Sequence, residues 1–110
     1  MTKERMTRKW GEWEVIEKGN GYKLKKLTVL PSRSISLQYH NHRSETWCIL
    51  QGHGQMILGN SEFSVFEGDT VVVPIQEKHK ITCTSTIPLV AIEVQLGEIT
   101  EEDDIVRLDE

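Results

Sequence analysis

Residues 40–45 have the sequence HNHRSE, in which two histidines two positions apart are followed closely by a glutamate. Alternate residues of a β-strand project from the same face, so His40 and His42 point together if they lie on one strand. A further histidine, His79, begins another β-rich run later in the chain. Imidazole and carboxylate groups are typical ligands of Zn²⁺ and related divalent metals. We therefore predict a metal site formed by His40, His42, Glu45 and His79.

The sequence around these residues is typical of an all-β fold. From residue 13 onward, short β-type runs alternate with Gly, Asn, Ser or Pro. Tight turns are expected at Gly19-Asn20-Gly21 and at Gly59-Asn60, because glycine accepts positive φ freely. No segment has a helical period. Strands are predicted at residues 13–17, 22–30, 35–40, 45–51, 55–58, 62–66, 70–73, 79–84 and 89–96. A jelly-roll barrel is the arrangement that leaves the fewest exposed edges.

Length and composition indicate a single globular domain, residues 1–110. Of these residues, 37% are hydrophobic and 27% are charged, and the formal net charge is -4. The acidic residues concentrate in a C-terminal tail at about 98–110, so we do not expect nucleic acid as a partner. No apolar run is long enough for a membrane span or follows the basic N-terminus as a signal peptide. Two cysteines, Cys48 and Cys83, form no disulfide framework, which favours a cytoplasmic location.

Two choices stay open within the metal site. If residues 35–42 form one strand, Gln38 shares a face with His40 and His42 and is a further candidate ligand. Glu45 either completes the ligand set or acts as the general base of a catalysed reaction, with a pKa raised by burial. If Glu45 is a ligand, the sequence identifies no base.

Basic residues lie close to these candidates in the sequence. Lys25 has the strand parity expected of a residue that reaches the barrel interior or mouth. Arg43 and Lys80 each lie beside a proposed ligand. We take Lys25 and Arg43 as candidate substrate-binding residues, and Lys80, with Glu45, as a candidate catalytic residue. Such a group favours an anionic substrate.

These motifs resemble the two motifs of the cupin superfamily, the first over residues 40–52 and the second over residues 68–79. Within the cupins, the sequence is similar to the type II mannose-6-phosphate isomerases, whose isomerase domain often forms the C-terminal part of a mannose-1-phosphate guanylyltransferase. The segments that carry this similarity are residues 8–15, 22–25, 36–47, 92–97 and 102–108.

The resemblance implies a cupin jelly roll, also called a double-stranded β-helix. It also implies a homodimer and conversion of mannose 6-phosphate to fructose 6-phosphate. The implied cofactor is a divalent metal, with Zn²⁺ as the first choice and Mn, Fe, Ni or Co as alternatives. Because no nucleotidyltransferase segment precedes the cupin motifs, we do not expect guanylyl transfer.

The sequence also departs from the family pattern. Ser32 and Gln76 stand where glycine is usual, Lys80 replaces an arginine, and Cys83 replaces an asparagine. The usual Tyr-Gly-Arg ending is absent. These departures keep two alternatives open: a metal cupin of another reaction class, such as a dioxygenase, and a non-catalytic cupin that binds a sugar or another ligand.

Overall fold

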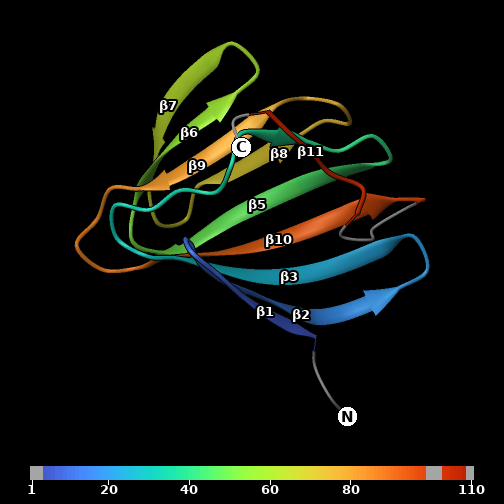
Figure 1. The fold of residues 1–110 in the computed structure, drawn as a ribbon, viewed down its shortest axis with the longest axis horizontal. Coiled ribbons are helices and arrows are strands. Elements are labelled where there is room, and N and C mark those ends of the chain that lie inside the picture. Colours follow the sequence, from blue (N-terminus) through green and yellow to red (C-terminus); the bar gives the residue numbers. More distant parts are fainter. Residues whose placement is uncertain (1–3, 99–102, 109–110) are drawn as a thin grey trace.

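In the computed structural model, which describes residues 4–98 and 103–108, the chain forms two antiparallel β-sheets that face one another (Figure 1). The six-stranded sheet has the order β1 (Arg5–Arg8), β2 (Gly11–Gly19), β3 (Tyr22–Val29), β10 (Leu89–Gly97), β5 (Arg43–Gln51), β8 (Thr70–Val73). The five-stranded sheet has the order β11 (Val106–Arg107), β4 (Gln38–Tyr39), β9 (His79–Cys83), β6 (Gly54–Leu58), β7 (Ser61–Val65). The predicted all-β jelly roll is confirmed. The described residues include no helix that is long and apolar enough to cross a membrane.

The strand predicted over residues 35–40 is not formed over that length, and residues 35–42 do not form the single strand that would place Gln38, His40 and His42 on one face. Only Gln38–Tyr39 is a strand, and residues 40–42 leave it in a bend. As a result, His40 is buried whereas the His42 side chain is 51% exposed, so the two histidines do not share a face. The rule that alternate residues share a face does not apply here, because the strand pairing of β4 ends before His40.

Strands β1 and β11 were not predicted from the sequence. Every residue of β1 is exposed, so this strand has no alternation of buried and exposed residues. Strand β11 is two residues long and pairs with β4, so it depends on a tertiary contact. It belongs to the acidic tail expected at 98–110, in which Asp104 is buried. Residues 99–102 and 109–110 of this tail lie outside the described residues.

Both predicted hairpin turns are formed. Strands β2 and β3 are joined through Asn20-Gly21, with Gly21 at a φ of 82°. Strands β6 and β7 are joined through Gly59-Asn60, with Gly59 at a φ of 60°. These positive φ angles explain the glycines, since only glycine adopts them without a steric cost.

On four strands, β3, β5, β9 and β10, the inward-facing residues are apolar towards one end of the barrel and polar towards the other. On β10, Leu89 and Ala91 are followed by Glu93 and Gln95, all four of them buried. Strand pairing aligns the same change on β3 and β5, and β9 of the facing sheet has it as well. The apolar part contains Leu27 and Val29, Ile49, and Ile81 and Cys83, and the polar part contains Lys23 and Lys25, Arg43 and Glu45, and His79. The barrel therefore has an apolar core at one end and a buried polar cluster at the other.

Ser32 and Gln76 adopt positive φ angles of 69° and 67°, which favour glycine. A residue with a Cβ in this region costs roughly 1–2 kcal/mol. Replacement by glycine removes that cost, but it also makes the unfolded chain more flexible, which offsets part of the gain. We predict that Ser32→Gly and Gln76→Gly each raise the free energy of unfolding by about 0.5–1 kcal/mol, as measured by urea denaturation. Alanine at the same positions is the control, because it removes the polar side chain but keeps the Cβ that makes a positive φ unfavourable. If Ser32→Ala and Gln76→Ala stabilise the protein as much as glycine does, the positive φ is not the cause.

Candidate metal centre

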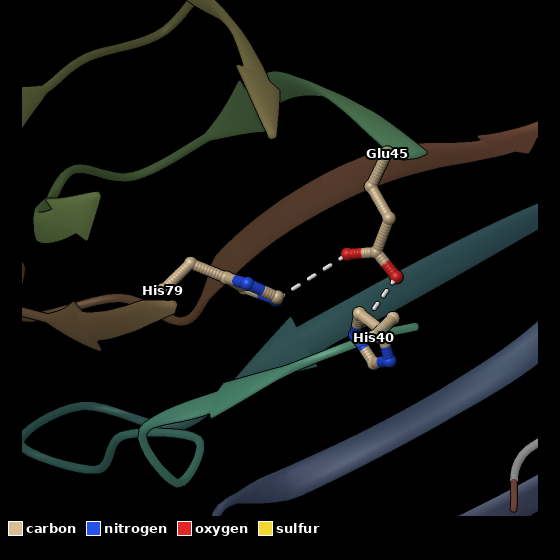
Figure 2. Close-up of side chains that lie close together, drawn as sticks. All are labelled: His40, Glu45 and His79. Atoms are coloured by element: carbon tan, nitrogen blue, oxygen red, sulfur yellow. Dashed lines mark ion pairs between the residues drawn. The ribbon is translucent and has the colours of Figure 1, made fainter. Parts of the chain in front are cut away.

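Three buried side chains converge in the polar part of the barrel: His40, Glu45 and His79 (Figure 2). One donor atom from each lies within 4.8 Å of the others. His40 Nε2 is 3.1 Å from Glu45 Oε2, and His79 Nε2 is 3.4 Å from Glu45 Oε1. None of the three residues is more than 3% exposed. The structure therefore brings together two imidazoles and one carboxylate, a ligand set typical of divalent transition metals.

The three residues come from separate elements of the fold. Glu45 lies on β5, where its neighbours across the strands are Val73 and Gln95. His79 is the first residue of β9 and pairs with Gln38 of β4. His40 directly follows β4 and is not held by a strand ladder. The cluster therefore forms only when both sheets are in place.

The far nitrogen of each imidazole already has a partner. His40 Nδ1 is 2.6 Å from the backbone oxygen of Asp104, and His79 Nδ1 is 3.2 Å from that of Glu77. A carbonyl oxygen only accepts hydrogen bonds, so both Nδ1 atoms must carry the proton and donate it. When such an imidazole is neutral, its Nε2 carries no proton, and the lone pair of that nitrogen faces the Glu45 carboxylate. Backbone carbonyls fix metal-binding histidines in the same way.

Acceptor atoms facing one another require a positive charge between them. Arg43 supplies part of it, because its Nε donates to Glu45 Oε2 at 3.0 Å and its Nη2 lies 3.4 Å from His40 Nε2. Trp47 Nε1 donates to Glu45 Oε1 at 3.0 Å. His79 Nε2, however, is buried without a hydrogen bond in the described part of the chain, since its approach to Glu45 lacks hydrogen-bond geometry. A divalent ion fits this set of donors, because it would satisfy both lone pairs and the carboxylate.

Electrostatics keep the Glu45 carboxylate charged. Burial by itself would raise the pKa of Glu45, but His79, His40 and Arg43 together outweigh burial and hold that pKa below its usual value. Burial lowers the pKa of His40, which favours the neutral imidazole that a metal requires. For His79, burial is outweighed by the Glu45 carboxylate, and its pKa is raised. An ionised Glu45 is suited to be a ligand and poorly suited to be a general base near neutral pH.

A cavity of about 560 Å³ opens onto His40 and Glu45. This volume lies within the usual range of small-molecule sites. Among the described residues, those with charge that line it are two acids, Glu45 and Glu93, and six bases: Arg8, Lys9, Lys25, Arg43, Lys80 and Arg107. The bases come from both ends of the chain and from three strands between them. The balance of charge around the cavity favours an anionic ligand.

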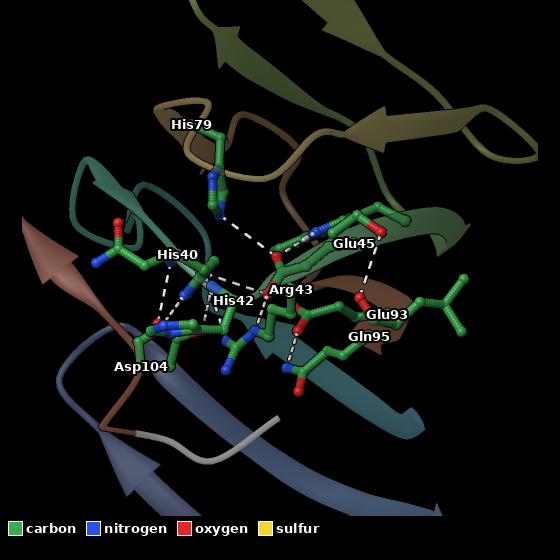
Figure 3. Close-up of polar contacts among 12 residues, drawn as sticks. His40, His42, Arg43, Glu45, His79, Glu93, Gln95 and Asp104 are labelled. Atoms are coloured by element: carbon green, nitrogen blue, oxygen red, sulfur yellow. Dashed lines mark hydrogen bonds and ion pairs between the residues drawn. The ribbon is translucent and has the colours of Figure 1, made fainter. Parts of the chain in front are cut away.

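Glu93 is the second carboxyl group of this cavity and lies outside the donor cluster. It is 3% exposed, and on the neighbouring strands it is opposite Lys25 and Trp47. Gln95 Nε2 donates a hydrogen bond to its Oε1 (Figure 3). Burial, and then the negative charge of Glu45, raise the pKa of Glu93 to about 7. Glu93 is thus poised to exchange a proton near neutral pH.

The other residues predicted from the sequence lie around the cluster. His42 points away from it, with Nδ1 3.1 Å from Asp104 Oδ1. Gln38 lines the cavity, and its Oε1 accepts a hydrogen bond from Ser36 Oγ at 3.1 Å. Lys25 is buried with Nζ 4.2 Å from the centre of the Trp13 ring. Lys80 and Arg43 line the same cavity.

Comparison with known proteins shows the family of the chain. The family described as "Mannose-6-phosphate isomerase C-terminal" matches residues 1–110. A mannose-1-phosphate guanylyltransferase of Salmonella muenchen is 36% identical over 93% of this chain and 22% of its own length. The alginate biosynthesis protein AlgA of Pseudomonas aeruginosa is 36% identical over 94% of this chain and 21% of its own length. The chain thus spans about a fifth of these relatives.

Solved structures support the fold independently. A cupin-2 domain protein from Rhodospirillum rubrum superposes with a TM-score of 0.82 at 20% identity, covering 98% of this chain and 76% of its own. At this identity, the likeness concerns the fold alone. Because the family matches every residue from 1 to 110 and the strands are arranged as in a cupin, the chain belongs to the mannose-6-phosphate isomerase C-terminal domain family.

Proposed function

We propose that this protein is a metal-dependent phosphohexose isomerase that interconverts mannose 6-phosphate and fructose 6-phosphate. The observation that carries the proposal is the pair of buried imidazoles whose Nε2 atoms lie 3.1 and 3.4 Å from the Glu45 carboxylate, next to a cation-lined cavity that reaches His40 and Glu45. The metal ligands in this proposal are His40, Glu45 and His79. Zn²⁺ is the first choice for two imidazoles and one carboxylate, and Mn, Fe, Ni or Co are alternatives.

Aldose–ketose isomerisation moves a proton between neighbouring carbons through an enediol. A divalent ion, when bound, would polarise the carbonyl and hydroxyl oxygens of the sugar. The ion would also take the place of Arg43 as the neighbour of His40 Nε2, and Arg43 would serve as a substrate contact. Glu93, buried in the same cavity with a pKa of about 7, would remove and return the proton. In this assignment Glu45 is a ligand, and the role first considered for it, that of base, falls to Glu93.

The phosphate of the substrate would be bound by the basic residues at the cavity. Arg8 and Arg107 provide guanidinium groups, which are suited to bidentate phosphate contacts. Lys25 of β3 and Lys80 of β9 line the same cavity and add positive charge without that geometry. The excess of basic over acidic lining residues supports a phosphosugar over a neutral sugar.

The test is to identify the metal of the purified protein by elemental analysis and to measure isomerisation of mannose 6-phosphate. We expect one metal ion per chain, turnover that a chelator abolishes and added metal restores, and no turnover of unphosphorylated mannose. Bound metal without turnover, at protein concentrations that would reveal a slow enzyme, would contradict the isomerase. Absence of bound metal after incubation with Zn²⁺, Mn²⁺, Fe²⁺, Co²⁺ and Ni²⁺ would contradict the metal centre itself.

The donor set also supports a second candidate function. Two histidines and one carboxylate form the ligand set of non-haem Fe(II) oxygenases, in which the remaining positions bind oxygen and substrate. A dioxygenase-like cupin would therefore use the same three residues. It would be recognised by oxygen consumption that requires Fe(II), in preparations in which Zn²⁺ supports no reaction. The homodimer stays a prediction, which sedimentation of the protein would test.

A further inference from the structure

Asp104 joins the C-terminal segment to the loop of residues 40–42, which no strand ladder holds at the metal cluster. Its carboxylate accepts hydrogen bonds from the backbone nitrogens of Asn41 and His42, each at 3.0 Å, and also approaches His42 Nδ1 (Figure 3). Its own backbone oxygen accepts the hydrogen bond from His40 Nδ1 at 2.6 Å. One residue of the C-terminal segment thus contacts three successive residues of the ligand loop.

The position of His40 depends on this contact more than on its own strand. Strand β4 ends at Tyr39, and the loop after it is also contacted by Gln76, whose backbone N donates to His40 O at 2.7 Å and whose side chain donates to Asn41 Oδ1 at 3.5 Å. The C-terminal segment is itself anchored, because β11 pairs with β4 and Leu108 N donates to Leu37 O at 2.7 Å. Asp104 is therefore the buried link between an anchored segment and a loop without a ladder.

We propose that Asp104 is a positioning residue of the metal centre. It holds His40 in the Nδ1-protonated form, with Nε2 directed at Glu45, and it holds His42 away from the cluster. The expected effect on metal affinity rests on the proposed metal site. The position and hydrogen bond of His40, which the inference explains, are present without a metal. Partners that orient metal-binding histidines typically change metal affinity by about 10–100-fold when they are removed.

The effects of two substitutions follow from hydrogen-bond chemistry. Asp104→Ala removes both acceptors from the backbone nitrogens of residues 41 and 42, so of these contacts only the one between His40 Nδ1 and the backbone oxygen of residue 104 is left to link the loop to the C-terminal segment. Asp104→Asn keeps one oxygen acceptor but turns an NH₂ group towards the second backbone donor, so its effect should be intermediate. The neighbouring Asp103 is exposed and has the same charge, so Asp103→Ala is the matched control.

The experiment measures Zn²⁺ affinity at neutral pH by competition with a chromophoric chelator, in folded protein checked by circular dichroism. We expect a loss of about 10–100-fold for Asp104→Ala, a smaller loss for Asp104→Asn, and no change for Asp103→Ala. In the metal-free protein, the ¹⁵N spectrum of the histidines should show His40 protonated at Nδ1 in the wild type. It should show a mixture of tautomers in Asp104→Ala.

The two readouts separate this inference from the proposed function. If the wild type binds no Zn²⁺, the metal site fails, and the tautomer of His40 still tests the role of Asp104. If Asp104→Ala does not fold, Asp104→Asn decides. Unchanged affinity together with an unchanged His40 tautomer, in a folded Asp104 variant, would show that this residue only stabilises the fold.

Discussion

Replacing His40 with alanine is expected to weaken divalent metal binding by roughly 100-fold or more, whereas replacing His42 should leave affinity within a few-fold of the wild type. Loss of a hydrogen-bond partner of a ligand already costs about 10–100-fold, so loss of a ligand should cost at least as much. His40 Nε2 faces Glu45 at 3.1 Å from a buried position. The half-exposed His42 imidazole is paired with Asp104 outside the cluster. The sequence spacing predicts that both histidines are ligands, whereas the structure places only His40 in the cluster, so the pair of variants distinguishes the two.

Affinity is measured by chelator competition, and metal content by elemental analysis after dialysis. His79→Ala should behave like His40→Ala, because His79 completes the donor cluster. His53→Ala serves as a control, because His53 lies in a distant turn, where its Nδ1 contacts Thr84 Oγ1 at 3.0 Å. Equal losses in His40→Ala and His42→Ala would mean that His42 turns inward in the metal-bound protein. Full metal retention in His40→Ala would refute the proposed ligand set.

Glu93→Gln should lower kcat for mannose 6-phosphate by about 10²–10⁴-fold, the usual contribution of a positioned general base, with a much smaller effect on metal content. The amide keeps the size of the side chain and removes its ability to take a proton. A base acts only when it is deprotonated, so the rate should rise with pH through the pKa of Glu93. That pKa is about 7 without a metal, and the charge of a bound divalent ion would lower it, so the acid limb should lie at or below about 7.

This acid limb should disappear in Glu93→Gln, and the pH profile distinguishes a catalytic role from a structural one. A variant that only disturbs packing would lower the rate at every pH and keep the limb. Glu62→Gln is the matched control, because Glu62 is exposed on β7. A wild-type kcat in Glu93→Gln would show that Glu93 is not the general base. Glu45→Gln would then be the next variant to examine.

The sequence predicts the strands of the barrel well where each strand alternates buried and exposed residues. Strands β5 and β9 show this alternation, and so Glu45 and His79 are correctly placed on inward faces. The ligand loop is predicted less well, because the H-x-H spacing looks like strand alternation while the chain bends after Tyr39. The resemblance to the cupins names the fold, but the orientation of His42 depends on Asp104, which is distant in sequence.

Glu93 could have been found from the sequence. In the run from Leu89 to Leu96 it has the parity of Leu89 and Ala91, which are core residues. A carboxyl group with the parity of a core face is a signal for a functional site. The role of Asp104 has no comparable signal, because its partners are brought to it only by the pairing of β11 with β4. Contacts of this kind arise from tertiary structure and leave no periodic pattern.

The division of the barrel interior into an apolar and a polar part affects how this fold can change over evolution. The apolar part, with Val29, Ile49 and Leu89, supplies the hydrophobic stabilisation, and it contributes no donor atom to the cluster. The polar part can therefore exchange side chains, and with them substrate or metal, while the folding free energy is carried elsewhere on the same strands. A barrel organised in this way can diversify its chemistry by substitutions near one end without first acquiring a more stable core.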